Sequence, residues 1–366
     1  MGSPKRRFVW LVALVSVVAL AGAACGSKKS DSSSSSTTAA AAAGASVDYS
    51  SLSGTINGSG ATFPKAFYEE AISGFKEVAS GVTVNYNAVG SGQGKKDLAA
   101  GTSDWAGTDS TVKDDEKATF KGPFLYFPTV AAPITVSFNV KGVTKLQLDA
   151  DTLAKIFMGT ITTWNDPAIA ATNSGVTLPA EPIVVAVRSD GSGTTSNFSK
   201  YLKAAAPESF TLEAGDTVQW PNAQAAKGNA GVAQLVKDSE GAIGYVDYSD
   251  AKATGLTFAS IKNKDGQFVA ASLDGATAAA ASAEVKPDLT YNPLNASGAA
   301  AYPITAPTYI IVYTAQSDAA KGNAIKGWIN FVLTDGQALA ADVDFAKLPD
   351  SLQQKAVAQL SQLQIG

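Results

Sequence analysis

The triplet Gly-Ser-Gly occurs three times in this chain of 366 residues, and each copy stands between a strand-like and a helix-like segment. The copies are found in NGSGATFPKAF from Asn57, in VGSGQGKKDL from Val89 and in VRSDGSGTTSNFS from Val187. Apolar residues alternate over 82–88 before the second copy, and the unbroken run IVVAV precedes the third, as in a strand covered on both faces. Only the short GTIN precedes the first copy, and it is a weaker strand signal.

Helical periodicity follows the first and third copies. After the first, Pro64 stands as at a first helical turn, and apolar residues recur at Phe67, Ala71, Phe75 and Val78. After the third, they recur at Phe198, Tyr201 and Leu202. A strand, a glycine turn and a helix form the βα unit of an open α/β sheet, whose ligands bind beyond the carboxyl ends of the strands. The pattern further predicts strands at 134–140 and 307–313, helices at 149–159 and 322–336, and surface loops with a short helix over 270–300.

Composition excludes several classes of function. The chain has no histidine and a single cysteine, Cys25, so Ser-His triads, imidazole metal sites, thiolate clusters and intrachain disulfides are all excluded. We therefore expect no metal and no cofactor. Beyond residue 24 the chain has 25 basic and 32 acidic residues, which argues against nucleic acid as a partner. The length predicts two domains, or one large one.

The first 24 residues have the pattern of a signal peptide, with a basic start, an apolar run from Phe8 to about Leu20 and small residues before Cys25. A lipoprotein signal is favoured over a plain signal peptide or a membrane anchor, although Gly22 stands where leucine is typical. Residues 25–50 are then a lipidated cysteine, carrying palmitate, and a disordered Ser/Ala linker. The sequence predicts an exported protein tethered to the membrane.

The glycine turns predict an anion site. A helix N-terminus exposes unpaired backbone N–H groups and the positive end of the helix dipole, and glycine lets an anion approach the backbone closely. Hydroxyl groups stand beside these amides at Thr62, Ser91, Ser192 and Thr194. Arg188 ends the strand before the third turn and could engage two oxygens, while Asp190 would hold its guanidinium in place.

Asp109, in the segment DWAGTDS, suggests which anion is bound. A carboxylate repels an anion unless the anion carries a proton to donate. Inorganic phosphate keeps a proton near neutral pH and sulfate does not, so a buried Asp109 would select phosphate and reject sulfate.

Other interpretations of the same residues remain open at this stage. A single Gly-Ser-Gly is most often a plain loop, and an Arg-x-Asp pair is usually an exposed ion pair. A receptor for another oxyanion, such as sulfate, is the nearest alternative. A secreted hydrolase using Ser73 and Lys76 is a more distant one, because the Ser-x-x-Lys pattern falls in mid-helix and no Lys-Thr-Gly follows it. Phe63, Trp105 and Trp164 are interpreted mainly as packing residues.

Taken together, the motifs resemble the extracytoplasmic phosphate-binding protein of the high-affinity phosphate ABC transporter. The resemblance runs from about Ile56 to Leu360 and rests on GSGATFP, VNYNAVGSGQGKKDL, DWAGTDS, FPTVAAPI, VRSDGSGT, GAIGYVDY, YPITAPTYI and FAKLPDSL. It implies an α/β, two-domain type II periplasmic-binding-protein fold, hinge-connected, with the ligand in the interdomain cleft. The first domain would comprise 52–130 plus 303–366, and the second 131–302.

The resemblance also assigns roles to residues. Thr62 and Phe63 would contact phosphate from the first turn and Ser91 from the second, while Asp109 would accept the phosphate proton. Arg188 would pair with the anion, held by Asp190, and the third turn would contribute Ser192, Gly193 and Thr194. The pair Gly92-Gln93 departs from the Ser-Gly common in the family, which leaves a secondary contact without support.

The resulting hypothesis is a phosphate-binding lipoprotein that delivers phosphate to a membrane permease and catalyses no reaction. We expect a monomer outside the cytoplasm, anchored to the cell membrane by its lipid, whose two domains close over the ligand.

Overall fold

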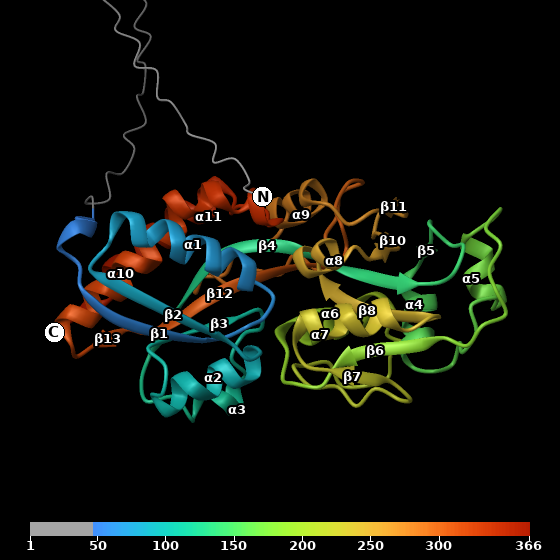
Figure 1. Ribbon diagram of the computed structural model, residues 1–366, viewed down its shortest axis with the longest axis horizontal. Helices are drawn as coiled ribbons and strands as arrows, with labels where there is room; N and C mark the ends of the chain where they lie inside the picture. The colour runs from blue at the N-terminus through green and yellow to red at the C-terminus, as the bar shows by residue number, and fades with distance from the viewer. Residues whose placement is uncertain (1–46) are drawn as a thin grey trace, which may run out of the picture. The chain divides into compact units, whose positions relative to one another are not determined.

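The computed structural model describes residues 47–366 (Figure 1). The predicted signal peptide at 1–24, Cys25 and most of the predicted linker lie outside the described residues. The sequence predicts disorder up to residue 50, but Tyr49 begins a 3-10 helix, Tyr49–Ser51, and packs edge-on against Phe75 with 5.8 Å between ring centres. No helix within 47–366 is long and apolar enough to span a membrane.

The first lobe is built on one part of a curled mixed sheet, in the order β2-β1-β3-β12-β4. Strands β1, β2 and β3 are parallel, whereas β12 lies antiparallel between β3 and β4 and comes from the last fifth of the chain. The first lobe therefore contains both ends of the described chain. Its strands are β1 (Gly54–Gly60), β2 (Val82–Ala88), β3 (Trp105–Thr108) and β12 (Thr305–Tyr313), and its helices are α1 (Lys65–Val78), α2 (Ser91–Ala100), α3 (Asp114–Lys117), α10 (Ala319–Leu333) and α11 (Asp350–Gln359).

Strand β4 (Phe124–Asn139) passes from the first lobe into the second (Figure 1). It pairs with β12 up to Pro133 and with β8 from Ile134 onward. The sheet then continues in the second lobe in the order β4-β8-β6-β7, with β9 also on β4. These strands are β6 (Val184–Arg188), β7 (Gln224–Ala226), β8 (Ala242–Asp247) and β9 (Thr257–Phe258).

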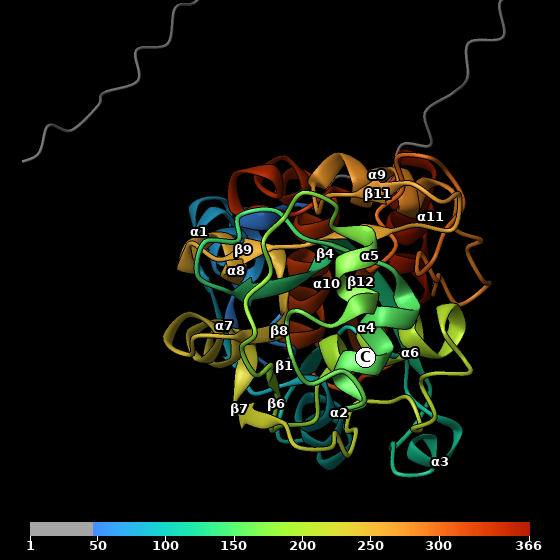
Figure 2. The same ribbon diagram turned by 90° about the vertical axis from the view of Figure 1, so that its right-hand side faces the viewer.

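Helices cover the sheet of the second lobe, and α4 and α5 lie nearest the viewer in Figure 2. The helices are α4 (Ala150–Phe157), α5 (Pro167–Thr172), α6 (Gly193–Ala205), α7 (Gly228–Asp238), α8 (Tyr248–Thr254) and α9 (Leu273–Ala281). Two small sheets complete the fold, one of β5 (Gln147–Leu148), β10 (Ser260–Lys262) and β11 (Phe268–Val269), the other of β13 (Ala315–Gln316) and β14 (Gln364–Ile365). Short 3-10 turns span Asp335–Leu339, Ala341–Val343 and Leu360–Gln362.

Most of the predicted strands and helices are confirmed, but several begin or end at other residues than predicted. The predicted strand 134–140 is only the second half of β4. Most of the strand is buried, and its first half lacks the alternation of apolar and polar residues that indicates a strand in the sequence. Val78 was expected on the apolar face of α1, but it is the last residue of that helix and is 42% exposed. The region 270–300 contains one helix, α9, and is otherwise loop.

The first Gly-Ser-Gly is not a turn. Gly58 and Gly60 lie within β1, and the corner follows them at residues 61–64. A Cβ atom on Gly58 would lie 2.2 Å from the ring of Trp105, and one on Gly60 would lie 2.0 Å from the carbonyl oxygen of Gly107. These glycines are required because neighbouring groups approach the strand closely, which leaves no room for a side chain.

Candidate functional site

The first corner joins β1 to α1 and contains Thr62 and Phe63. The ring of Phe63 is buried and packs against Phe345 with 5.8 Å between ring centres, so this side chain faces the core. The Oγ1 atom of Thr62 accepts a hydrogen bond from Nδ2 of Asn229 at 3.0 Å, and Asn229 belongs to the second lobe. The first corner thus contacts the opposite lobe through a hydroxyl group.

The second corner joins β2 to α2. Gly90 precedes the helix with φ of +99°, a conformation that favours glycine, and Ser91 is the first helical residue. The Ser91 hydroxyl is fully buried and accepts a hydrogen bond from the backbone N–H of Asp109 at 3.2 Å. It also lies 3.4 Å from Oδ2 of the same aspartate, which follows β3. The parallel strands β2, β1 and β3 therefore bring Ser91 and Asp109 together at their carboxyl ends.

The third corner joins β6 to α6. Arg188 ends β6, and its guanidinium is held by Asp190 through Nε at 2.8 Å and through Nη2. Asp190 also accepts a hydrogen bond from the backbone N–H of Gly228 at 3.0 Å. Ser192 caps α6, since its Oγ accepts from the backbone N–H of Thr195 at 3.1 Å. The Nη1 group of Arg188 donates to no other residue within 47–366, so it is available to a ligand.

The second and third corners touch each other directly. The backbone N–H of Gly92 donates to the carbonyl oxygen of Gly191 at 3.0 Å, across the two lobes. A Cβ atom on Gly193 would lie 2.5 Å from Oγ of Ser91 and 2.7 Å from Cβ of Asp109. The structure therefore brings the predicted residues into one place, at the junction of the lobes: Thr62, Phe63, Ser91, Asp109, Arg188, Asp190, Ser192, Gly193 and Thr194.

Asp109 titrates near neutral pH. Its side chain is 3% exposed, and burial raises its pKa from the usual value of 3.8 to about 7. The hydrogen bond from Thr308 Oγ1, at 2.7 Å, and the charge of Arg188 lower the pKa, but not enough to offset burial. The nearby charge of Asp216 raises it further. This carboxyl group can therefore exchange a proton with a ligand at neutral pH.

Asp190 behaves in the opposite way. Burial alone would raise its pKa, but the hydrogen bonds and charge of Arg188, with the N–H of Gly228, outweigh burial and lower the pKa. The Arg188 side chain is 1% exposed, so both charges are held out of water and neutralise each other. The remaining donors at the corners are uncharged hydroxyl and amide groups.

Three residues at the site have no counterpart in the sequence prediction. Asn229 donates to both Thr62 and Thr194, and Asn197 donates through Nδ2 to the carbonyl oxygen of Asp109 at 2.6 Å. Thr308 holds Asp109 from the middle of β12. A polar residue inside the buried run PTYIIVY and an Asn directly after Gly228 at a helix start are the signals that could have indicated two of them.

Trp105, Trp164 and the Ser73–Lys76 pair do not take part in the contacts of this site. Trp105 and Trp164 are fully buried packing residues, as predicted. Ser73 is exposed, and Nζ of Lys76 donates to the backbone carbonyl of Ser80 at 2.6 Å instead of to that serine. No group of three or more acidic, histidine or cysteine side chains within 47–366 is arranged to hold a metal ion.

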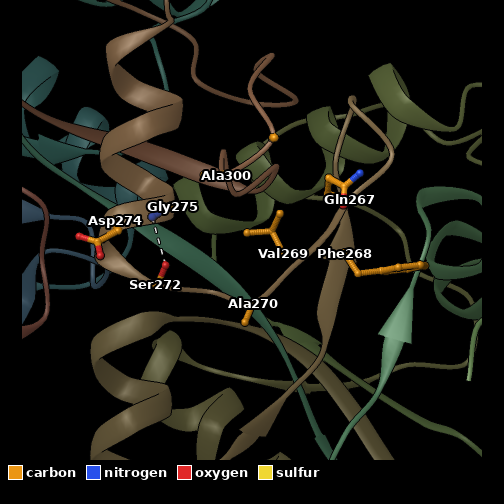
Figure 3. A pocket seen from close by; sticks show the side chains of 9 residues that line it. Gln267, Phe268, Val269, Ala270, Ser272, Asp274, Gly275 and Ala300 are labelled. Atoms are coloured by element: carbon orange, nitrogen blue, oxygen red, sulfur yellow. Dashed lines mark hydrogen bonds between the residues drawn. The ribbon is translucent and has the colours of Figure 1, made fainter.

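The described part of the chain has a hollow beside the glycine corners and another in the second lobe. A crevice of about 620 Å³ opens beside the second and third corners and is lined by both lobes, including Gly92, Lys96 and Lys113 from one and Asp190, Asp216 and Lys227 from the other. A second hollow of about 580 Å³ lies in the second lobe, near the start of α9, where the backbone N–H of Gly275 donates to Oγ of Ser272 at 3.1 Å (Figure 3). Of these two, the crevice is the one that adjoins the glycine corners.

Comparison with known proteins identifies the family. A model described as a PBP superfamily domain matches residues 33–336. Phosphate-binding protein PstS of Pasteurella multocida is 36% identical over 310 residues, which cover 83% of this chain and 89% of that protein. Phosphate-binding protein PstS 3 of Mycobacterium tuberculosis is 34% identical over 363 residues, which cover 95% of this chain and 96% of that protein. The chain belongs to the PstS family of phosphate-binding proteins.

Solved structures place this PstS-family chain in the predicted fold class. A high affinity periplasmic phosphate-binding protein, PfluDING, solved with phosphate bound, has a TM-score of 0.71 at 24% identity, covering 86% of this chain and 96% of that one. The phosphate-binding protein from Stenotrophomonas maltophilia has a TM-score of 0.65 at 19% identity, covering 83% and 93%. The prediction of an α/β, two-domain type II periplasmic-binding-protein fold is confirmed.

The raised pKa of Asp109 predicts how the stability of this PstS-family protein depends on pH. A raised carboxyl pKa means that the folded state binds the proton more tightly, so the cost of burying the charge begins above pH 3.8 and is complete above about 7. In protein stripped of anions, Asp109→Asn should therefore stabilise more at pH 8 than at pH 5, by about 2–3 kcal/mol in the free energy of unfolding. Urea unfolding at both pH values measures this, and an equal effect at both would contradict it.

Proposed function

We propose that this protein binds inorganic phosphate outside the cytoplasmic membrane and delivers it to the permease of a phosphate ABC transporter, without catalysing a reaction. The observation that carries the proposal is the meeting of three corners at one place between two lobes, with a proton-exchanging Asp109 and a guanidinium held by Asp190. The names of the relatives, which are phosphate-binding proteins, support the same ligand.

The corners suit a small tetrahedral anion. The first turns of α2 and α6 supply N–H groups at Ser91, Gly193 and Thr194, and the corner before α1 supplies those of Thr62 and Phe63. Hydroxyl groups of Thr62, Ser91, Ser192 and Thr194 add uncharged donors. Taking a doubly charged ion out of water is costly, and a dense set of hydrogen bonds is what offsets that cost.

One proton shared between Asp109 and the ligand gives the site its selectivity. With a pKa of about 7, the carboxyl group loses its proton in the same pH range in which phosphate loses its second one. An anion that keeps a proton can donate it to Asp109, whereas sulfate has none and meets a repulsive charge. Phosphate and arsenate are therefore the expected ligands at neutral and alkaline pH.

Calorimetric titration of the full-length protein, purified in detergent, tests the ligand. Between pH 7 and 9 phosphate and arsenate should bind and sulfate should not, and lowering the pH to 5 should weaken the discrimination because Asp109 becomes protonated. Ser91→Ala combined with Arg188→Ala should abolish phosphate binding, while Ser73→Ala should leave it unchanged. Sulfate binding as tight as phosphate at pH 8 would remove the role proposed for Asp109.

The two lobes are proposed to be domains that close over the ligand, 52–130 plus 303–366 against 131–302. Support comes from β4, which changes its partner from β12 to β8 between Pro133 and Ile134, and from the hydrogen bond of Ile134 N–H to the carbonyl oxygen of Ile304 at 2.7 Å. Both crossing segments therefore lie side by side, as a two-strand hinge requires. Direct contacts between the lobes support the interpretation of the described conformation as the closed form.

A buried ion pair between the lobes favours this closed form. Lys95 on α2 is 2% exposed, and its Nζ lies 2.7 Å from Glu116 in its own lobe and 3.0 Å from Asp216 in the other. Asp216 in turn supports the third corner, because its carbonyl oxygen accepts the backbone N–H of Ser192 at 2.8 Å. Opening the cleft would expose the carboxylate to water, so the pair matters only when the lobes are closed.

Replacing Lys95 should therefore weaken phosphate binding by shifting the lobes toward the open form. Lys95→Met leaves Asp216 buried without its partner on closure, and we expect phosphate affinity to fall by about 10- to 100-fold. Calorimetry measures the affinity, and X-ray scattering with and without phosphate measures the closure. Lys155→Met removes an exposed pair within the second lobe and should change neither. If Lys95→Met binds phosphate with wild-type affinity, the ion pair between Lys95 and Asp216 does not stabilise the closed form.

A lipid on Cys25 would keep the binding protein beside its permease. The proposal rests on the signal-like first 24 residues and on the position of the only cysteine directly after them. The protein should incorporate labelled palmitate and partition into detergent, and Cys25→Ser should do neither. Label that persists in the Cys25→Ser variant would show that the lipid is elsewhere. The protein is further proposed to act as a monomer, which sedimentation of the detergent-purified protein would check.

A further inference from the structure

Asn229 connects two of the proposed phosphate contacts that come from opposite lobes. It is the second residue of α7 and is completely buried. Its Nδ2 donates to Oγ1 of Thr62 in the first lobe at 3.0 Å and to Oγ1 of Thr194 in the second lobe at 3.1 Å. Its backbone N–H also points to Oγ1 of Thr62, at 3.3 Å. One side chain thus contacts a hydroxyl on each side of the cleft.

These contacts determine what the two hydroxyls can do. A threonine hydroxyl has one proton and two lone pairs, and it rotates to suit its neighbours. Because Thr62 and Thr194 both accept from Asn229, each keeps its own proton for a different partner. Within residues 47–366 neither hydroxyl donates to a protein acceptor. Both therefore keep a proton for an anion at the corners.

The side-chain oxygen of Asn229, Oδ1, makes this arrangement energetically unfavourable for the protein alone. Oδ1 is buried and has no hydrogen-bond partner within the described residues. Unpaired buried acceptors are uncommon, since they lose their bonds to water and gain none in return. With the amide turned the other way, Oδ1 would take the protons of both threonines. The observed orientation leaves them available.

We propose that Asn229 is a positioning residue for phosphate binding, whose amide holds the hydroxyls of Thr62 and Thr194 as proton donors toward the anion. This inference rests on the phosphate-binding function proposed above. A hydroxyl that turned its lone pairs toward the anion would repel it, so correct orientation matters more for an anionic ligand than for a neutral one. Because Asn229 and Thr62 lie in different lobes, the amide completes this arrangement only on closure.

A double-mutant cycle tests the proposal in the full-length protein, with phosphate affinity measured by calorimetry. Asn229→Ala should lower the affinity by about 10- to 100-fold, in keeping with the loss of two well-oriented donors to a charged acceptor. In a Thr62→Val, Thr194→Val background the same change should lower the affinity by less than about 3-fold, because no hydroxyl is left to orient. If Asn229→Ala lowers phosphate affinity by the same factor in that background as in the wild type, the proposal is overturned.

Asn197 provides a matched control. It is another buried asparagine, and its Nδ2 donates to the carbonyl oxygen of Asp109 in the first lobe at 2.6 Å and to that of Gly193 in its own lobe at 2.9 Å. Within the described residues it makes no hydrogen bond to a hydroxyl group. Asn197→Ala should therefore lower phosphate affinity by the same factor in both backgrounds. If Asn197→Ala shows the same loss of effect as Asn229→Ala, the coupling reflects lobe closure in general, and the specific role of Asn229 is overturned.

A second variant guards against simple unfolding. Asn229→Asp keeps the shape of the side chain but can only accept, so the carboxylate takes the protons of Thr62 and Thr194 and adds a like charge. We expect a larger loss of phosphate affinity than in Asn229→Ala, with the circular dichroism spectrum of the wild type. Phosphate binding equal to wild type in Asn229→Asp would refute the inference. Absence of phosphate binding in the wild type would instead refute the proposed function.

Discussion

Close approach of neighbouring groups to the backbone of glycines is the constraint on which the site depends. Gly193 faces Ser91 and Asp109 so closely that any side chain would overlap them, and Gly90 faces Asp190 in the same way. Deeper in the first lobe, Gly60 faces the backbone of Gly107. The repeated glycines are therefore needed because they leave room for neighbouring groups, more than because they make the chain flexible. They allow corners from three distant stretches of chain to present N–H groups and hydroxyls to a single small volume.

The same corners also bring the carboxyl groups of Asp109 and Asp190 close to the anion site, where a negative charge would repel the ligand. Their charges must therefore be neutralised. Asp190 neutralises much of Arg188, and burial leaves Asp109 close to its protonation midpoint at neutral pH. In the proposed function, the site holds an anion mainly through uncharged donors, and one shared proton determines which anion fits. Lys95 and Asn229 each also contact the opposite lobe. Lys95 pairs with Asp216, and Asn229 donates to Thr62. In the proposed mechanism, these contacts couple phosphate binding to closure of the lobes.

The sequence predicts the site well where the signal is local. The corner at Ser192–Thr194 follows from glycines between clear strand and helix patterns, and the corner at Ser91 from glycines after a clear strand pattern. Asp109 follows from an acidic residue beside a predicted anion site. The sequence predicts the first corner at Gly58–Gly60, but these residues belong to β1 and the corner follows at 61–64. The segment GTINGSG contains few apolar residues, and it forms a strand because it pairs with β2 and β3. Asn229 and Thr308 were missed because their partners, Thr62 and Asp109, are 167 and 199 residues away, a relation that one sequence does not reveal.

The most direct test of the central claim is a crystal structure of the protein with phosphate. The account predicts one phosphate ion between the lobes, with its oxygens about 2.6–3.1 Å from Oγ of Ser91, from the guanidinium of Arg188 and from the N–H groups that begin α6. One phosphate oxygen should lie at a short distance from the Asp109 carboxyl group. A phosphate ion bound elsewhere, or a cleft that closes without one at saturating phosphate, would contradict it.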